Sequence, residues 1–268
     1  MLTSERKEGW VHWFFSFKHN LGLAPEKLEQ VIKNVPKGTK VYKNKILGQR
    51  GRTTGLVFPN FDRRLHVVTD AFCKKYLTKD RKAERFIIFS SGLDTSYSQK
   101  SPDTISMTFH GITNKGKCIQ LDELVYNNRD LQTPLAPSDI VVRYIDFLER
   151  NRKKWGFARN VFIDNADQAT ITEFKKYKRN HGCIYTFQDS WKKTQIIDRI
   201  KLQLGWFAEL NYFIAEHCEY TIKELENYSW EEGEDNVPED RNDHCINSAQ
   251  YSWLPYKTKI GCETIANQ

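Results

Sequence analysis

Three aspartates stand where secondary-structure elements are expected to end or begin. Asp94 closes the apolar stretch RFIIFSSGLD, Asp164 closes NVFID, and Asp243 precedes the last amphipathic segment, NDHCINSAQYSWL. In a mixed sheet whose central strands lie side by side, the ends of the first and fourth strands, which Asp94 and Asp164 close, can be neighbours, and a helix packed on that face can bring a third group within reach. Each aspartate taken singly is more often a turn former or a helix cap. Only their joint arrangement favours a functional site.

Clustered carboxylates repel one another unless a cation neutralises them. Hard oxygen ligands suit Mg²⁺ or Mn²⁺, and two such ions about 4 Å apart can activate a water and stabilise the leaving oxygen of a phosphodiester. The three aspartates therefore predict two bound ions and hydrolysis of a phosphodiester. His244 can orient water or protonate a leaving group in such a site, and a structural histidine is the alternative interpretation.

The segments around these aspartates indicate an α/β fold. RFIIFSSGLD, residues 104–110 and residues 118–125 read as three consecutive strands with short links, which predicts an antiparallel meander. NVFID, a helix over residues 169–182 and the strand IYTF predict a parallel crossover unit. Further helices are predicted at residues 25–35, at 138–150 with Ser138 as N-cap, at 193–207, at 221–230 and from Asp243 onward, with a short strand in YFIAEHC. We therefore expect a mixed sheet flanked by helices.

The composition favours a soluble, intracellular protein with a polyanionic partner. No apolar run approaches the ~20 residues needed to cross a bilayer. Lys and Arg number 41 against 34 Asp and Glu, a net charge of +7 that favours phosphate contacts, although each basic cluster alone reads as a solvated face. The six cysteines form no C-x-x-C pair, so we expect free thiols and no zinc at the doublets His217-Cys218 and His244-Cys245.

The chain resembles, over residues 85–256, the nuclease domain of tailed-phage large terminases. The stretches that carry this resemblance, in order and spacing, are FIIFSSGLDTSYSQKSPDTIS, VFIDNADQATITEFKKY, SWKKTQIIDRI and CEYTIKELENYSW with DRNDHCINSAQY. It implies a ribonuclease H-like fold over residues 85–268. Residues 1–84, including GWVHWFFSF, are similar to the end of that family's ATPase domain and its linker. No G-x-x-x-x-G-K-[ST] loop occurs, so the chain is expected to be a C-terminal piece that lacks the ATPase motor.

The family pattern, carried over residue by residue, makes Asp94 and Asp164 metal ligands and places Asp243 and His244 at the edge of the site. The family has D-H-x-x-D-A here, with the second aspartate as a ligand, where this chain has Asn247. An amide oxygen can coordinate Mg²⁺ without adding charge, so metal affinity should fall, or Asp243 or His244 supplies the missing ligand.

Four further residues lie around this pattern. Lys192 and Lys193 are near a family lysine that can contact phosphate. Asp103 reads as a turn residue, and Asp167 as a helix cap or a group that supports the ligands.

The resemblance implies a metal-dependent endonuclease of a phage or prophage that cuts double-stranded DNA during genome packaging in the host bacterial cytoplasm. Its implied partners are the portal protein, the small terminase subunit and the missing motor portion. One alternative is a catalytically weakened module that docks on DNA or on the portal, which Asn247 motivates. Another is a transposase, integrase or junction resolvase of the same fold class, against which the aromatic N-terminal stretch argues.

Overall fold

The computed structural model describes residues 55–95, 104–164, 167–190, 194–231, 237–239 and 243–262, together with the single positions 22, 24 and 27. The chain divides into two compact units, residues 1–56 and residues 57–268, and the second holds the fold described below. Several predicted features lie outside the described residues: the stretch GWVHWFFSF, the helix at residues 25–35 as a continuous element, Asp103, Lys192 and Lys193.

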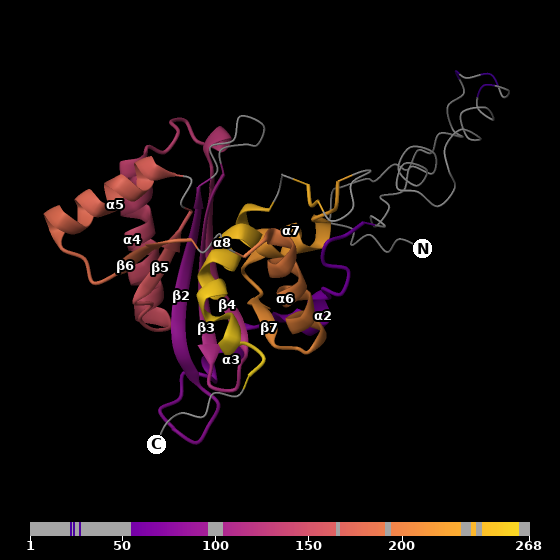
Figure 1. Cartoon of the computed structure of the whole chain (residues 1–268), viewed down its shortest axis with the longest axis horizontal. Coiled ribbons are helices and arrows are strands. Elements are labelled where there is room, and N and C mark those ends of the chain that lie inside the picture. Colours follow the sequence, from indigo (N-terminus) through magenta and orange to yellow (C-terminus); the bar gives the residue numbers. More distant parts are fainter. Residues whose placement is uncertain are drawn as a thin grey trace, which may run out of the picture. The chain divides into compact units, whose positions relative to one another are not determined.

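A seven-stranded mixed sheet forms the centre of the described fold (Figure 1). Its strand order is β1-β7-β4-β3-β2-β5-β6. The strands are β1 (Val67–Val68), β2 (Phe86–Thr95), β3 (Thr104–Thr113), β4 (Cys118–Asn127), β5 (Asn160–Ile163), β6 (Thr186–Asp189) and β7 (Tyr212–Ala215). Strands β2, β3 and β4 pair in antiparallel fashion and every other pair is parallel. The predicted meander is therefore confirmed.

Helices connect and cover the strands largely as the sequence predicts. They are α2 (Arg63–His66), α3 (Asp70–Lys74), α4 (Pro137–Lys154), α5 (Gln168–His181), α6 (Ile196–Ala208), α7 (Glu219–Asn227) and α8 (His244–Trp253), with 3₁₀ turns at Asn128–Asp130 and Leu254–Lys259. Strand β5, helix α5 and strand β6 form the predicted parallel crossover unit. Among the described residues, no helix is both long and apolar enough to span a bilayer.

The predicted N-cap of α4 was wrong. Ala136, and not Ser138, is the N-cap, and Pro137 is the first helical residue. The carboxylate of Asp139 accepts the backbone N–H of Ala136 at 3.0 Å. Proline at the first position has its φ already set for the helix and no N–H to satisfy, so the helix begins there and Ser138 lies inside it.

Two groups of helices cover opposite faces of the sheet. The hydroxyl of Tyr144 in α4 donates to Ser91 Oγ at 2.9 Å, whereas Ser248 of α8 donates from its Oγ to the carbonyl of the next residue, Gly92, at 2.9 Å. Because successive strand residues face opposite sides, α4 and α8 lie on different faces. Helix α5 packs with α4, and α8 packs on β2 and β3 (Figure 1).

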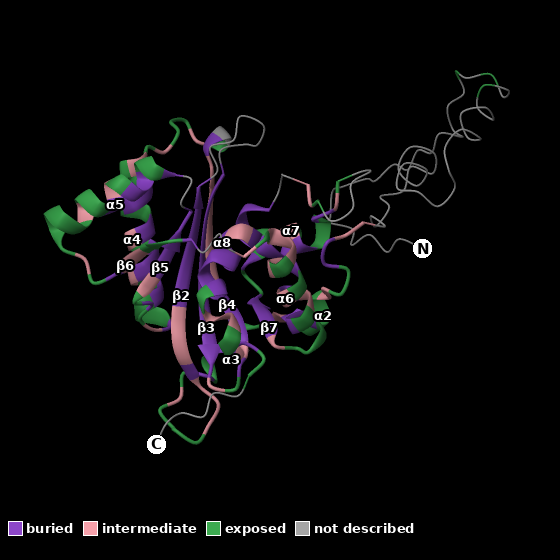
Figure 2. Ribbon diagram, in the orientation of Figure 1, coloured by how far each residue is buried: buried purple, intermediate pink, exposed green. Residues whose placement is uncertain are grey.

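The interior of the fold is continuous from β1 to the helices. Strand β3 is buried along its whole length, and much of its neighbour β2 is also coloured as buried in Figure 2. Val57, Phe58, Cys73 and Tyr76 belong to the same apolar cluster as the sheet. Residues that precede β2 in the chain thus share the core of the second unit. The assignment of residues 1–84 to an ATPase remnant stays a prediction.

Candidate functional site

The sheet brings Asp94 and Asp164 to one edge. Strands β2 and β5 run parallel with Leu93 opposite Ile163, and the N–H of Asp164 donates to the carbonyl of Leu93 at 3.0 Å. Asp94 and Asp164 are the next residues along the two strands, and they are 4% and 8% exposed. Two carboxylates thus stand at adjacent strand ends, as their positions after the apolar strands predicted.

Helix α8 brings two further groups to the same edge. Asp94 is two and four residues from Gly92 and Ser90, so all three face α8. His244, the first residue of α8, lies with its Nδ1 3.2 Å from Asp94 Oδ2. Asp243 is the N-cap residue, and its charge acts on Asp94. Four of the predicted site residues, Asp94, Asp164, Asp243 and His244, are thus brought together.

Burial and charge perturb the titration of this group. Removal from water, opposed by the bond from His244 and reinforced by the charges of Asp164 and Asp243, raises the pKa of Asp94 to about 6. Burial disfavours the charged form of His244, but the bond to Asp94 and the surrounding carboxylates outweigh it and raise the His244 pKa. The neighbouring carboxylates therefore act on both members of the Asp94–His244 pair.

Asn247 is tied to Asp243. Its amide Nδ2 donates to Asp243 Oδ2 at 3.0 Å, and the hydroxyl of Tyr228 donates to the same oxygen at 3.1 Å. Asp243 is therefore held as a hydrogen-bond acceptor within the protein. Asp243 and Asn247 are therefore hydrogen-bonded to each other.

The donor set fits a hard divalent cation in part. Asp94 and Asp164 offer carboxylate oxygens side by side, the ligands that Mg²⁺ and Mn²⁺ prefer. Among the described residues, however, no group of three His, Cys, Asp or Glu side chains is arranged to hold a metal ion. The pair Asp94 and Asp164 fits the cation by its chemistry, and the third protein ligand is not in place.

Asp167 connects the site to helix α5. It is the N-cap of α5 and its Oδ1 accepts the N–H of Thr170 at 3.0 Å, which confirms the predicted capping role. Its other oxygen accepts the hydroxyl of Thr95, the last residue of β2, at 2.9 Å. The same carboxylate therefore joins the strand that carries Asp94 to the helix that follows Asp164.

Sequence reasoning missed Tyr251, on which the charges of Asp94 and Asp164 act, and Arg199, whose charge acts on Tyr251. Tyr251 lies one turn after Asn247 on α8, and burial with the charges of Asp94 and Asp164 raises its pKa strongly. The spacing of four residues from Asn247 was the signal that could have found it. Arg199 lies on α6. The sequence of α6 does not indicate which other helix it packs against, so the position of Arg199 could not be predicted.

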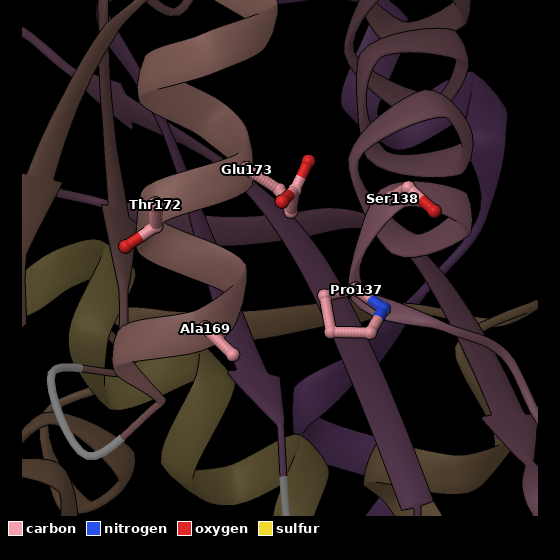
Figure 3. Close-up of a pocket in the computed structure, with 5 residues that line it drawn as sticks. All are labelled: Pro137, Ser138, Ala169, Thr172 and Glu173. Carbon is pink, nitrogen blue, oxygen red and sulfur yellow. The ribbon is translucent and has the colours of Figure 1, made fainter.

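A pocket of about 360 Å³ lies elsewhere, between the N-terminal ends of α4 and α5 (Figure 3). It is lined by Pro137, Ser138, Ala169, Thr172 and Glu173. Glu173 forms an ion pair with Lys176 at 2.7 Å. None of the clustered aspartates lines this pocket, so the acidic edge of the sheet is the candidate site.

Comparison with known proteins agrees with this architecture. No protein-family model matches the chain, and no curated protein sequence matches it. Among solved structures it is similar to the large terminase of a thermophilic bacteriophage, with a TM-score of 0.57, 19% identity, and coverage of 90% of this chain and 54% of that one. It is also similar to the P22 large terminase nuclease domain, with a TM-score of 0.53, 8% identity, and coverage of 78% and 94%.

The mixed sheet, with its meander, its parallel strands and its helices on both faces, is a ribonuclease H-like α/β fold. More narrowly, the chain has the fold of a phage large-terminase nuclease domain, which confirms the predicted fold class and the resemblance at the level of the fold. The chain spans about half the length of the thermophilic-phage terminase structure that it matches. Because one fold can host several activities, the activity has to be argued from the site.

Proposed function

We propose that this chain is the divalent-metal-dependent endonuclease portion of a phage large terminase, which cuts double-stranded DNA during genome packaging. The observation that supports it most is the register between β2 and β5, which sets Asp94 and Asp164 side by side beneath α8. Two buried carboxylates at one edge are a costly arrangement unless a cation neutralises them. The net charge of +7 is consistent with a nucleic-acid substrate.

In this proposal the residues divide the work of phosphodiester hydrolysis. Asp94 and Asp164 would hold Mg²⁺ or Mn²⁺, and the ion would supply activation of a water and charge neutralisation at the leaving oxygen. His244 fixes the orientation of Asp94 through the 3.2 Å contact between its Nδ1 and Asp94 Oδ2. Asp243 and Asn247 position the start of α8 through their mutual hydrogen bond.

The cellular setting belongs to the same proposal. The portal protein, the small terminase subunit and an ATPase motor portion are the proposed partners, and the host bacterial cytoplasm is the proposed location. The thermophilic-phage large terminase was also solved in complex with ATP-γ-S, and this chain carries no G-x-x-x-x-G-K-[ST] loop with which to cradle the phosphates of a nucleotide. We therefore assign nucleotide hydrolysis to the motor portion.

One observation favours a second function, a docking module without efficient cleavage. Asp243 is engaged by Tyr228 and Asn247, and the family pattern has an acidic ligand at the position where this chain has Asn247. A module of this kind would bind DNA or the portal and position the motor. Restoring the carboxylate distinguishes the two functions.

The deciding experiment is cleavage of supercoiled plasmid with Mn²⁺ or Mg²⁺, combined with calorimetric titration of Mn²⁺. We expect the natural protein to nick and linearise the plasmid, and Asp94→Ala and Asp164→Ala to lose both cleavage and Mn²⁺ binding. Asp146→Ala, which removes a carboxylate from α4 on the other side of the sheet, is the matched control and should behave like the natural protein.

The outcome for Asn247→Asp separates the hypotheses. Cleavage by Asn247→Asp alone would support the docking module. Equal cleavage by Asp94→Ala, or none by either the natural protein or Asn247→Asp, would remove the case for catalysis.

A further inference from the structure

Helix α6 packs against the C-terminal end of α8. Its Trp206 meets Trp253 of α8 edge to face, with ring centroids 4.8 Å apart. The ring of Phe58 is 6.0 Å from that of Phe207 of α6 and 6.3 Å from that of Tyr228. Tyr228 in turn donates to Asp243. Helix α6 is therefore packed near both the helix and the tyrosine that hold the site together.

Arg199 lies on the inward side of this helix. Residues 199, 203 and 206 follow helical spacing, and Gln203 and Trp206 are buried, so they share a face with Arg199. The guanidinium nitrogens Nε and Nη1 are buried and have no hydrogen-bond partner among the residues that the structure describes. A buried guanidinium without acceptors is unfavourable, so its donors need an acceptor from outside the described residues.

The charge of Arg199 reaches the site. Burial is the main cause that raises the pKa of Tyr228 and of Tyr251, and the positive charge of Arg199 opposes this rise in both. Tyr251 also senses Asp94 and Asp164. Yet Arg199 forms no ion pair with any described carboxylate. A cation thus stands near the two tyrosines that neighbour the acids, and two of its donors are used by no described residue.

We propose that the guanidinium of Arg199 binds a backbone phosphate of the DNA strand that the Asp94–Asp164 edge receives. This inference rests on the proposed nuclease function and adds to it a substrate-binding residue from a different helix. A planar guanidinium offers paired N–H donors that match two phosphate oxygens, which a lysine cannot reproduce. Its charge also offsets the repulsion that clustered carboxylates exert on a phosphate.

The test measures binding apart from cleavage. A short fluorescein-labelled duplex is titrated with protein in EDTA buffer, and anisotropy is followed at several salt concentrations. Arg199→Ala should weaken binding by about tenfold, the effect of one charge-assisted contact. It should also reduce the slope of log K against log salt by about one. Arg199→Lys should keep the slope and recover only part of the affinity.

Lys201→Ala is the matched control. Lys201 lies two residues further along α6 and is exposed, so its loss removes the same charge from the outer side of the helix. An effect of Lys201→Ala equal to that of Arg199→Ala would show a general charge effect and overturn the proposal. Because Arg199→Ala could unfold the chain, Arg199→Gln and circular dichroism accompany it. A purely structural role would lower the melting temperature without moving the salt slope.

The results also separate this inference from the proposed function. If the natural protein cleaves plasmid while Arg199→Ala and Arg199→Gln match it in affinity and salt slope, Arg199 is not a phosphate ligand and the nuclease assignment stands. If the natural protein binds the duplex through Arg199 but cleaves nothing, the phosphate contact stands and the nuclease assignment fails.

Discussion

The two faces of the sheet are packed against their helices by different kinds of contact. Towards α8 the contacts are small and polar: Ser90 Oγ donates to the Ser252 carbonyl at 2.7 Å, and Ser248 Oγ lies 3.0 Å from Thr108 Oγ1. On the side of α4 and α5 the packing is mainly aromatic, with Phe174 of α5 in ring contact with Tyr144 of α4 and Phe187 of β6. Hydrogen bonds are directional and apolar burial is not. The polar face can therefore fix the position of a helix along the strand.

That fixed face is the one that carries the acids. A Cβ added at Gly92 would lie 1.9 Å from the carbonyl oxygen of Ser248, so the backbones of β2 and α8 are in direct contact. His244 lies one turn before Ser248, and this contact sets it over Asp94. The aromatic face mainly stabilises the fold. The polar face fixes where α8, and with it His244, lies along strand β2. Substitutions on the two faces should therefore have different consequences.

The largest expected effect tests the aromatic face. Phe174→Ala should lower the free energy of unfolding by about 3–5 kcal/mol, because it opens a cavity where a fully buried ring was packed. Below its melting temperature the variant should still bind Mn²⁺ like the natural protein. Urea unfolding would measure the free energy of unfolding, and calorimetric titration would measure Mn²⁺ binding. Tyr177→Ala, at a partly buried position on the same helix, is the control, and a loss of Mn²⁺ binding in the folded Phe174→Ala variant would break the comparison.

The second prediction concerns Glu224, which anchors the start of α8. Its Oε2 accepts the N–H groups of Cys245 and Ile246, and burial raises its pKa from 4.5 to about 8, with Asp243 raising it and His244 lowering it. Between these values the folded state binds a proton that the unfolded state releases, so stability falls as pH rises. The loss attributable to Glu224 should be about 2–4 kcal/mol from pH 4.5 to 8.

Glu224→Gln isolates this contribution. Glutamine keeps an acceptor oxygen for the two N–H groups and does not titrate. The difference in unfolding free energy between the two proteins should therefore change across the window in favour of Glu224→Gln at high pH. Asp94, whose pKa is also raised, titrates in both proteins and cancels in the difference. A difference that stays constant with pH would contradict the prediction.

The sequence predicted the elements better than their mutual packing. Apolar stretches closed by Asp94 and Asp164 located the strand ends, because a strand and its polar terminus are local features. The closeness of α8 to the sheet depends on Gly92 meeting Ser248, a contact between residues far apart in the chain. Arg199 was missed for the same reason. Whether Arg199 is buried or exposed depends on which helix packs against α6.

Gly92→Ala tests the close contact itself. A methyl group cannot fit against the Ser248 carbonyl, so α8 must shift, at a cost of about 1–3 kcal/mol. We expect the shift to weaken Mn²⁺ binding and plasmid cleavage more than the stability loss alone explains. Calorimetry, cleavage and thermal melting would be compared on one preparation. Gly205→Ala, at a helical glycine with open space around its missing Cβ, is the control, and unaltered Mn²⁺ affinity in Gly92→Ala would count against the positional role of this face.

The smallest expected effect comes from single hydroxyls on the two faces. Ser248→Ala removes a bond to the Gly92 carbonyl and one to Thr108, whereas Ser91→Ala removes the acceptor for Tyr144 and a bond to the Thr108 carbonyl. Each variant loses two buried hydrogen bonds, so each should be destabilised by about 1–3 kcal/mol, towards the low end because alanine fills nearly the same space.

If Ser248→Ala and Ser91→Ala lose the same stability, a difference between them in Mn²⁺ affinity reports on position and not on stability. Ser248 lies on the helix that carries His244, and Ser91 faces the opposite helices. If the polar face fixes position, Ser248→Ala should reduce Mn²⁺ affinity and Ser91→Ala should not. The same affinity in both variants would show that apolar packing alone holds α8 in place, and the hydroxyls on that face would then be no more than satisfied polar groups.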